Sequence, residues 1–125
     1  MADKLTPRQI AQLAWLETVA PKLERLKRVL ETLAAHKADD AQIRATQRML
    51  DELKAQASQV NITSLAENFG YMAMLIRRQG GHQTKVRGLG ELLAGARINF
   101  EGAYREASTP VATPAAPVED DAVSP

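Results

Sequence analysis

The sequence contains no cysteine among its 125 residues and only two histidines, His36 and His82. Without cysteine the chain can form neither a disulfide, nor a thiolate nucleophile, nor a cysteine-ligated zinc site. Two histidines leave little scope for histidine-based metal binding or acid–base catalysis, and no carboxylate pair or nucleophile–base pair stands at a spacing typical of an active site. These absences predict a protein that uses no cofactor and no metal and is not an enzyme.

Long apolar runs are also missing. No stretch approaches the roughly 18 consecutive apolar residues that a membrane-spanning helix needs. The first four residues, Met-Ala-Asp-Lys, include an acid and lack the apolar segment of a secretory signal peptide. We therefore expect no membrane segment and a cytoplasmic location.

Proline and charge divide the chain into two parts. Four of its six prolines follow residue 108, where there is no aromatic residue and no Lys or Arg, but three acids: Glu119, Asp120 and Asp121. Such a segment cannot bury enough apolar area to offset its ordering entropy. Residues 108–125 are therefore predicted to be a disordered, Pro/Ala-rich acidic tail. Residues 1–107 form the predicted folded domain, whose net charge of +4 is masked by the +1 of the whole chain.

Before this tail, apolar residues recur at alternating steps of three and four, which is typical of amphipathic helices packed in a bundle. Thr6, in front of Pro7, is the predicted N-cap of the first helix. No alternating apolar–polar run of strand length occurs, so the predicted fold class is all-α, an antiparallel three- or four-helix bundle. The helices are expected at about 7–36, 40–59, 64–79 and 82–107.

Two positions leave the number of helices open. Pro21 interrupts the first helix, and because the apolar pattern continues in phase across it, a kink is favoured over two separate helices. The pattern changes phase at residues 61–63, where Ser64 followed by Glu67 matches a capping box that would open a third helix. The alternative is one long bent helix that runs through this point.

The last predicted helix contains an unusual number of glycines. Gly88, Gly95 and Gly102 recur every seven residues, and with Leu92 and Asn99 they form one stripe beside the apolar seam. Each glycine inside a helix costs about 1 kcal/mol relative to alanine. A stripe without side chains allows another backbone to approach closely, either within the bundle or from a partner.

The third predicted helix has more apolar residues than one core seam needs. Tyr71, Met74 and Leu75 lie off the seam, and residues 69–76 contain no charge, so something must cover this helix. Trp15, the only tryptophan, lies just off the first seam and is either a core-edge residue or an interface anchor. Together with the glycine stripe, these residues predict a non-enzymatic protein that contacts a protein partner or a second copy of itself, as an adaptor or a small subunit of an assembly.

A basic segment supports an alternative function. The acid-free stretch around Gly80–Gly81 holds four cations, Arg77, Arg78, Lys85 and Arg87. Such a cluster at the start of a helix suits phosphate, because the helix dipole and its free N–H groups favour anions there. The alternative is therefore a small helical subunit of a ribonucleoprotein that binds the RNA or DNA backbone without reading its sequence.

One pattern resembles a known enzyme family. Four residues separate Arg77 from His82, and HEPN-type helical ribonucleases carry an Arg-x(4–6)-His pair. The resemblance implies a metal-independent ribonuclease with these two residues in its active site. Here, however, Gly80–Gly81 interrupts the helical setting in which that family holds the pair.

Overall fold

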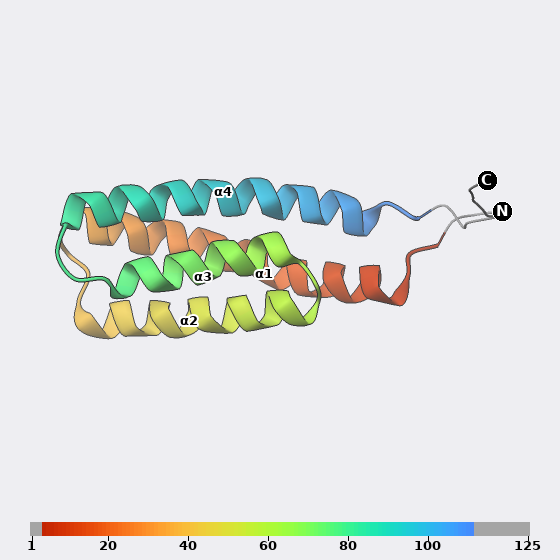
Figure 1. Ribbon diagram of the computed structural model, residues 1–125, viewed down its shortest axis with the longest axis horizontal. Coiled ribbons are helices and arrows are strands. Elements are labelled where there is room, and N and C mark those ends of the chain that lie inside the picture. Colours follow the sequence, from red (N-terminus) through yellow and green to blue (C-terminus); the bar gives the residue numbers. More distant parts are fainter. Residues whose placement is uncertain (1–3, 112–125) are drawn as a thin grey trace, which may run out of the picture.

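The computed structural model describes residues 4–111, which form four helices and no strand (Figure 1). Successive helices run in opposite directions. The α1–α2 and α3–α4 turns lie at one end of the molecule, and the α2–α3 turn lies at the other. This arrangement is an up-down-up-down bundle, so the all-α prediction is confirmed, with four helices instead of three. The helices are α1, Pro7–Ala34; α2, Asp40–Gln59; α3, Thr63–Arg77; and α4, His82–Ser108.

Local sequence explains how the first two helices begin. The Thr6 hydroxyl accepts a hydrogen bond from the Gln9 backbone N–H at 3.1 Å, and proline occupies the next position. Asp39 caps α2 by accepting from the Gln42 N–H at 2.7 Å. Helix α1 continues through Pro21 without ending, so two separate helices in this region are ruled out.

The predicted capping box at Ser64 and Glu67 is wrong. Helix α3 starts one residue earlier, at Thr63, and Ile62 precedes it without any side-chain capping bond. Packing fixes this turn instead, because Ile62 is only 7% exposed and its N–H donates to the Ala57 carbonyl at 2.9 Å.

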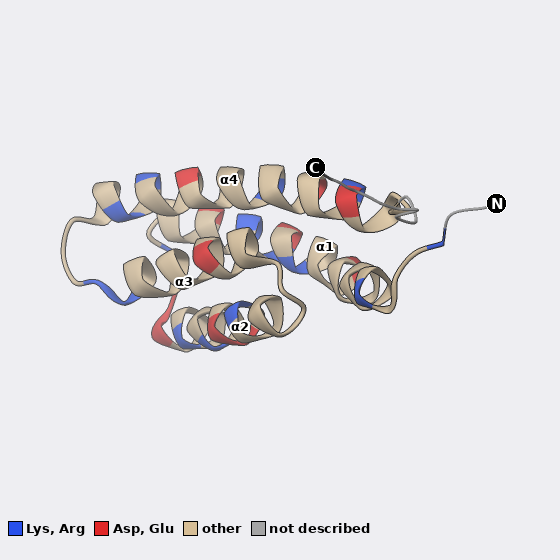
Figure 2. Ribbon diagram, turned by 45° about the vertical axis from the view of Figure 1, so that its right-hand side comes forward, with Lys and Arg blue, Asp and Glu red and all other residues tan. Residues whose placement is uncertain are grey.

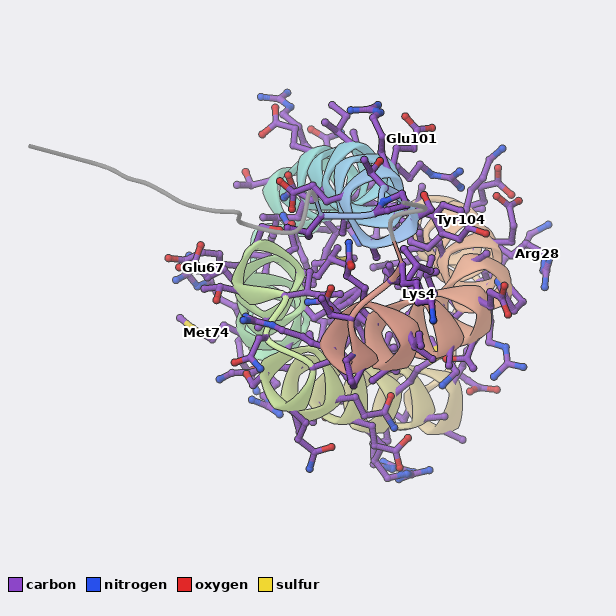
Figure 3. All side chains as sticks on the ribbon, turned by 90° about the vertical axis from the view of Figure 1, so that its right-hand side faces the viewer. Lys4, Arg28, Glu67, Met74, Glu101 and Tyr104 are labelled. Carbon is purple, nitrogen blue, oxygen red and sulfur yellow. The ribbon has the colours of Figure 1, made fainter. Side chains whose placement is uncertain are left out.

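The core lies between all four helices. The apolar residues predicted to recur on one face of each helix, such as Leu16, Phe69 and Leu89, are buried there. Helix α3 packs closely against both α2 and α4, α1 packs against α4, and α1 and α2 touch least among the pairs in contact. Charged residues of both signs lie along the outside (Figure 2). Viewed from one end, the four helices surround a common interior (Figure 3). The largest fully buried side chains are Phe69, Leu16, Leu26, Leu50, Leu53, Leu65, Met72, Leu89 and Val19.

Gln9 joins the first turn of α1 to the last turn of α4. Its amide nitrogen donates to the carbonyl oxygens of Glu106 at 3.1 Å and Thr109 at 2.7 Å. Its amide oxygen accepts from the Thr6 backbone N–H at 2.9 Å. The side chain is buried, with 7% of its surface exposed. Because carbonyls at a helix C-terminus and N–H groups at an N-terminus lack partners within their own helix, this one amide caps two helix ends.

Replacing Gln9 by alanine should lower the free energy of unfolding by about 2–3 kcal/mol, because three hydrogen bonds are lost and each contributes about 0.5–1.5 kcal/mol. Urea denaturation followed by circular dichroism would measure the change. Gln59→Ala is the matched control, since this exposed glutamine makes none of the side-chain hydrogen bonds found among residues 4–111. Equal losses in the two variants would contradict the capping role of Gln9.

Candidate interaction surface on the third helix

The outer face of α3 carries two large apolar side chains. Tyr71 is 57% exposed and Met74 is 59% exposed, although they belong to the helix with the largest share of its residues buried. They are three residues apart and therefore neighbours on one face of the helix. Figure 3 shows Met74 projecting from α3 away from the other helices.

A shallow groove of about 350 Å³ lies beside these two side chains, between α2 and α3. Small residues contribute to its lining, among them Ser58 and Gly70, while Tyr71 and Met74 form its large apolar members. Gly70 is constrained by its neighbour, because a Cβ at this position would lie 3.3 Å from Cδ of Lys54. The aliphatic stem of Lys54 thus crosses the glycine. Small residues next to large ones form the kind of groove that accepts a partner helix.

Leu75 and Gly88 contact each other within the bundle, which at this position is the first of the two alternatives for the glycine stripe. A Cβ built on Gly88 would lie 2.6 Å from Cδ2 of Leu75, closer than real contacts of this kind. Leu75 is half-buried and packs against the core cluster. The missing side chain at Gly88 therefore lets α3 and α4 approach each other, and this packing offsets the low helix propensity of glycine there.

The other members of the glycine stripe also divide between the interior and the outside. Gly95 faces Asn68, and the Asn99 amide donates to the Asn68 side-chain oxygen at 2.5 Å. Leu92 is half-buried against the core. Gly102, in contrast, faces open space, because a Cβ at this position would have no neighbouring atom within 4 Å. It lines a separate groove of about 600 Å³ next to the start of α3. The members of the stripe therefore meet different surroundings, and a partner contact at the stripe stays a prediction.

Trp15 is a core residue and not an interface anchor. It is only 9% exposed, and its indole N–H donates to the side-chain oxygen of Gln56 on α2 at 2.8 Å. The ring of this tryptophan is thus buried within the bundle, and its N–H has a hydrogen-bond partner there.

No protein-family model, curated protein or solved structure matches this chain. Within residues 4–111 no helix is both long enough and apolar enough to cross a membrane, and no three His, Asp or Glu side chains are grouped so that they could hold a metal ion. The cytoplasmic location stays a prediction.

The four cations expected to bind phosphate do not form one open cluster. Arg77 forms an ion pair with Asp51 on α2, with 2.5 Å between Nη2 and Oδ2. Arg78 and Arg87 are exposed and Lys85 is half-buried. Basic residues surround the connection between α3 and α4 in Figure 2. Three of the four predicted side chains therefore remain outside the ion pairs found among residues 4–111.

The two histidines meet at this same end of the bundle. The rings of His36 and His82 are stacked, with 3.8 Å between their centroids and 22° between their planes. His36 stands just beyond α1 with a φ of 59°, and His82 is the first residue of α4. Nε2 of His82 is buried and has no hydrogen-bond partner in the described part of the chain. Both residues and Arg87 line a pocket of about 330 Å³. Sequence reasoning missed this contact because residue spacing does not show where two turns meet.

Arg77 and His82 do not share a helix. Arg77 ends α3 and is paired with Asp51, whereas His82 starts α4 and stacks on His36. Gly80 and Gly81, with φ values of 75° and 57°, reverse the chain between them. The arrangement departs from the setting of the HEPN pair, and the ribonuclease alternative gains no support from it.

Alanine substitutions at two glycines of α4 should have clearly different effects. Gly90→Ala should stabilise the protein by up to about 1 kcal/mol, because nothing lies within 4 Å of the new Cβ and the helix propensity improves. Gly88→Ala should gain nothing and should fall at least about 1 kcal/mol below Gly90→Ala, because Leu75 has to move. Thermal or urea unfolding would measure this difference, and a similar gain in both variants would show that Gly88 is not needed for close packing.

Proposed function

We propose that this protein acts by binding another protein through the outer face of α3, as a non-enzymatic adaptor or a small subunit of an assembly. The single observation that carries the proposal is the pairing of Tyr71 and Met74, both more than half exposed, beside the groove between α2 and α3. They are adjacent on one helical face. The other exposed large apolar residues of the described chain lie outside α2 and α3: Ile10, Ile98, Tyr104 and Val111.

The chemistry of the pair suits a contact surface. Complete burial of a large apolar side chain contributes about 1.5–3 kcal/mol, so covering the exposed halves of Tyr71 and Met74 would add roughly 2–3 kcal/mol to binding. Methionine adapts to irregular partner surfaces, and tyrosine adds a hydroxyl that can form a hydrogen bond at the edge of the contact. Together they would be the central contacts of a small interface.

Met74→Glu should weaken binding of the protein partner at least about tenfold, because a carboxylate would be buried without a counter-charge. The fold should be unaffected, because Met74 is 59% exposed. Ile98→Glu is the matched control, since Ile98 is 69% exposed on α4 and is not part of the α2–α3 groove. The measurement is the titration of the variants against proteins that the full chain retains from its native source, quantified by mass spectrometry. An equal loss with Ile98→Glu, or no retained protein and no self-association, would contradict the proposal.

A second candidate function is binding of an RNA or DNA backbone at the end of the bundle that holds the α3–α4 turn. It is supported by Arg78, Lys85 and Arg87, which stay outside the ion pairs found in residues 4–111, and by the pocket that Arg87 lines. Such contacts would neutralise phosphates without reading bases.

This candidate predicts a strong dependence on salt. With three phosphate contacts, affinity for single-stranded RNA should fall about 20-fold between roughly 50 and 200 mM salt, because each contact releases a counterion. The double variant Arg78→Gln/Arg87→Gln should lose most of this dependence, whereas Lys22→Gln/Lys27→Gln on α1 should retain it. Filter binding with labelled RNA would measure it, and the absence of binding at the lowest salt would remove this candidate.

A further inference from the structure

We propose that the partner seated on the outer face of α3 is a second copy of this chain, with its α3 antiparallel to the first. The inference rests on the proposed function and names its partner. It comes from the order of four exposed residues along α3 and just after its end, and from what that order becomes when two copies face each other.

Three exposed residues of α3 and the exposed residue just after its end form a single stripe on the outside of the bundle. Glu67, Tyr71, Met74 and Arg78 follow one another at steps of four, three and four, the spacing that keeps side chains on one face of a helix. We call these four residues the outer stripe. Figure 3 shows Glu67 and Met74 pointing to the same side, away from the rest of the bundle. The stripe thus has an acid at one end, two large apolar side chains in its middle and a base at the other end.

Two copies of the outer stripe are complementary to each other when they run antiparallel. If a two-fold axis crosses α3 between Met72 and Ala73, Tyr71 of each copy faces Met74 of the other. The same axis places Glu67 of each copy opposite Arg78 of the other. A symmetric dimer requires that one surface patch contain both halves of every contact, and this stripe does.

The two charges select the antiparallel arrangement. In a parallel pair, Glu67 would face Glu67 and Arg78 would face Arg78, so like charges would repel each other at both ends. Neither residue takes part in the ion pairs found among residues 4–111. They also stand too far apart to neutralise each other within one chain, since 11 residues of helix extend about 16 Å. A second copy supplies the opposite charge at both ends at once.

The centre of the stripe fits a close approach of two helices. Gly70 lies next to Tyr71 and lines the groove between α2 and α3, where the aliphatic stem of Lys54 lies over it. The second copy therefore meets apolar surface beside the Tyr71–Met74 pair. A methionine sulfur beside a tyrosine ring is a favourable contact, and the symmetry produces it twice. Helix α3 has 15 residues, which corresponds to about 22 Å of contact. One such helix pair buries less than the roughly 800 Å² per partner of a standard interface, so the expected dissociation constant is on the order of micromolar.

Sedimentation equilibrium of the purified full chain tests the inference, over concentrations from about 1 µM to 1 mM chosen around that constant. Glu67→Arg and Arg78→Glu should each weaken self-association about tenfold or more, because each creates two like-charge contacts. The double variant Glu67→Arg/Arg78→Glu should restore dimerisation, because both pairs are again of opposite sign. An equimolar mixture of the two single variants should also form a dimer that neither variant forms alone.

Three results would overturn the inference. A wild-type chain that stays monomeric at the highest concentration would remove the second copy as partner, while retention of a different protein in a Met74-dependent manner would leave the proposed function intact. Charge reversals without effect on a dimer would place its interface elsewhere. A double variant that associates as weakly as the single variants, with an unchanged circular dichroism spectrum, would reject the pairing of Glu67 with Arg78. Ile98→Glu, on α4, should dimerise like the unmodified chain.

Discussion

The contact between Leu75 and Gly88 determines how closely α3 can approach α4, and the closure of the bundle depends on that approach. Helix α1 packs mainly on α4, and α2 packs mainly on α3, whereas α1 and α2 touch little although they are consecutive in the chain. The α1–α4 pair and the α2–α3 pair are therefore joined mostly through α3 against α4. A side chain at Gly88 would collide with Leu75. Gln9 joins α1 to the C-terminal end of α4, where its side-chain amide donates to the carbonyl oxygens of Glu106 and Thr109. Two small local features thus hold together a bundle whose first hairpin contributes little.

The spacing of apolar residues was sufficient to predict the fold because burial in a helical bundle follows the period of the helix. It placed Leu16, Phe69 and Leu89 in the core, and all three are buried. The helical spacing predicts on which side of a helix a residue lies, but it does not predict which residues of other helices contact that side. Gln9 was missed for this reason, since its hydrogen-bond partners lie about 100 residues away in the chain. The stacked pair of His36 and His82 depends in the same way on where two turns come together.

At the candidate site, too, the spacing did not predict which individual apolar residues of α3 contact another helix and which are exposed. Tyr71, Met74 and Leu75 all exceeded the needs of one core seam, but one residue of helix turns the side chain by about 100°. That rotation carries Leu75 round to Gly88 on α4, while Met74 stays outside. The stripe of glycines was ambiguous for a related reason, because a missing side chain signals a close neighbour without naming it. Only the packed structure separates Gly88, which meets Leu75, from Gly102, which faces open space.

The base of the outer stripe has an explanation within a single chain, and the apolar pair does not. Arg78, just after the end of α3, interacts favourably with the helix dipole whether or not a partner is present, whereas Glu67 lies beyond the first turn of the helix. The dipole gives no reason for Tyr71 and Met74 to remain exposed at positions where polar residues would serve the monomer equally well. Their place in the same four-three-four register as Glu67 and Arg78 is what a facing helix requires. In the proposed dimer, burial of Tyr71 and Met74 therefore favours association, and Glu67 and Arg78 favour the antiparallel orientation of the two helices.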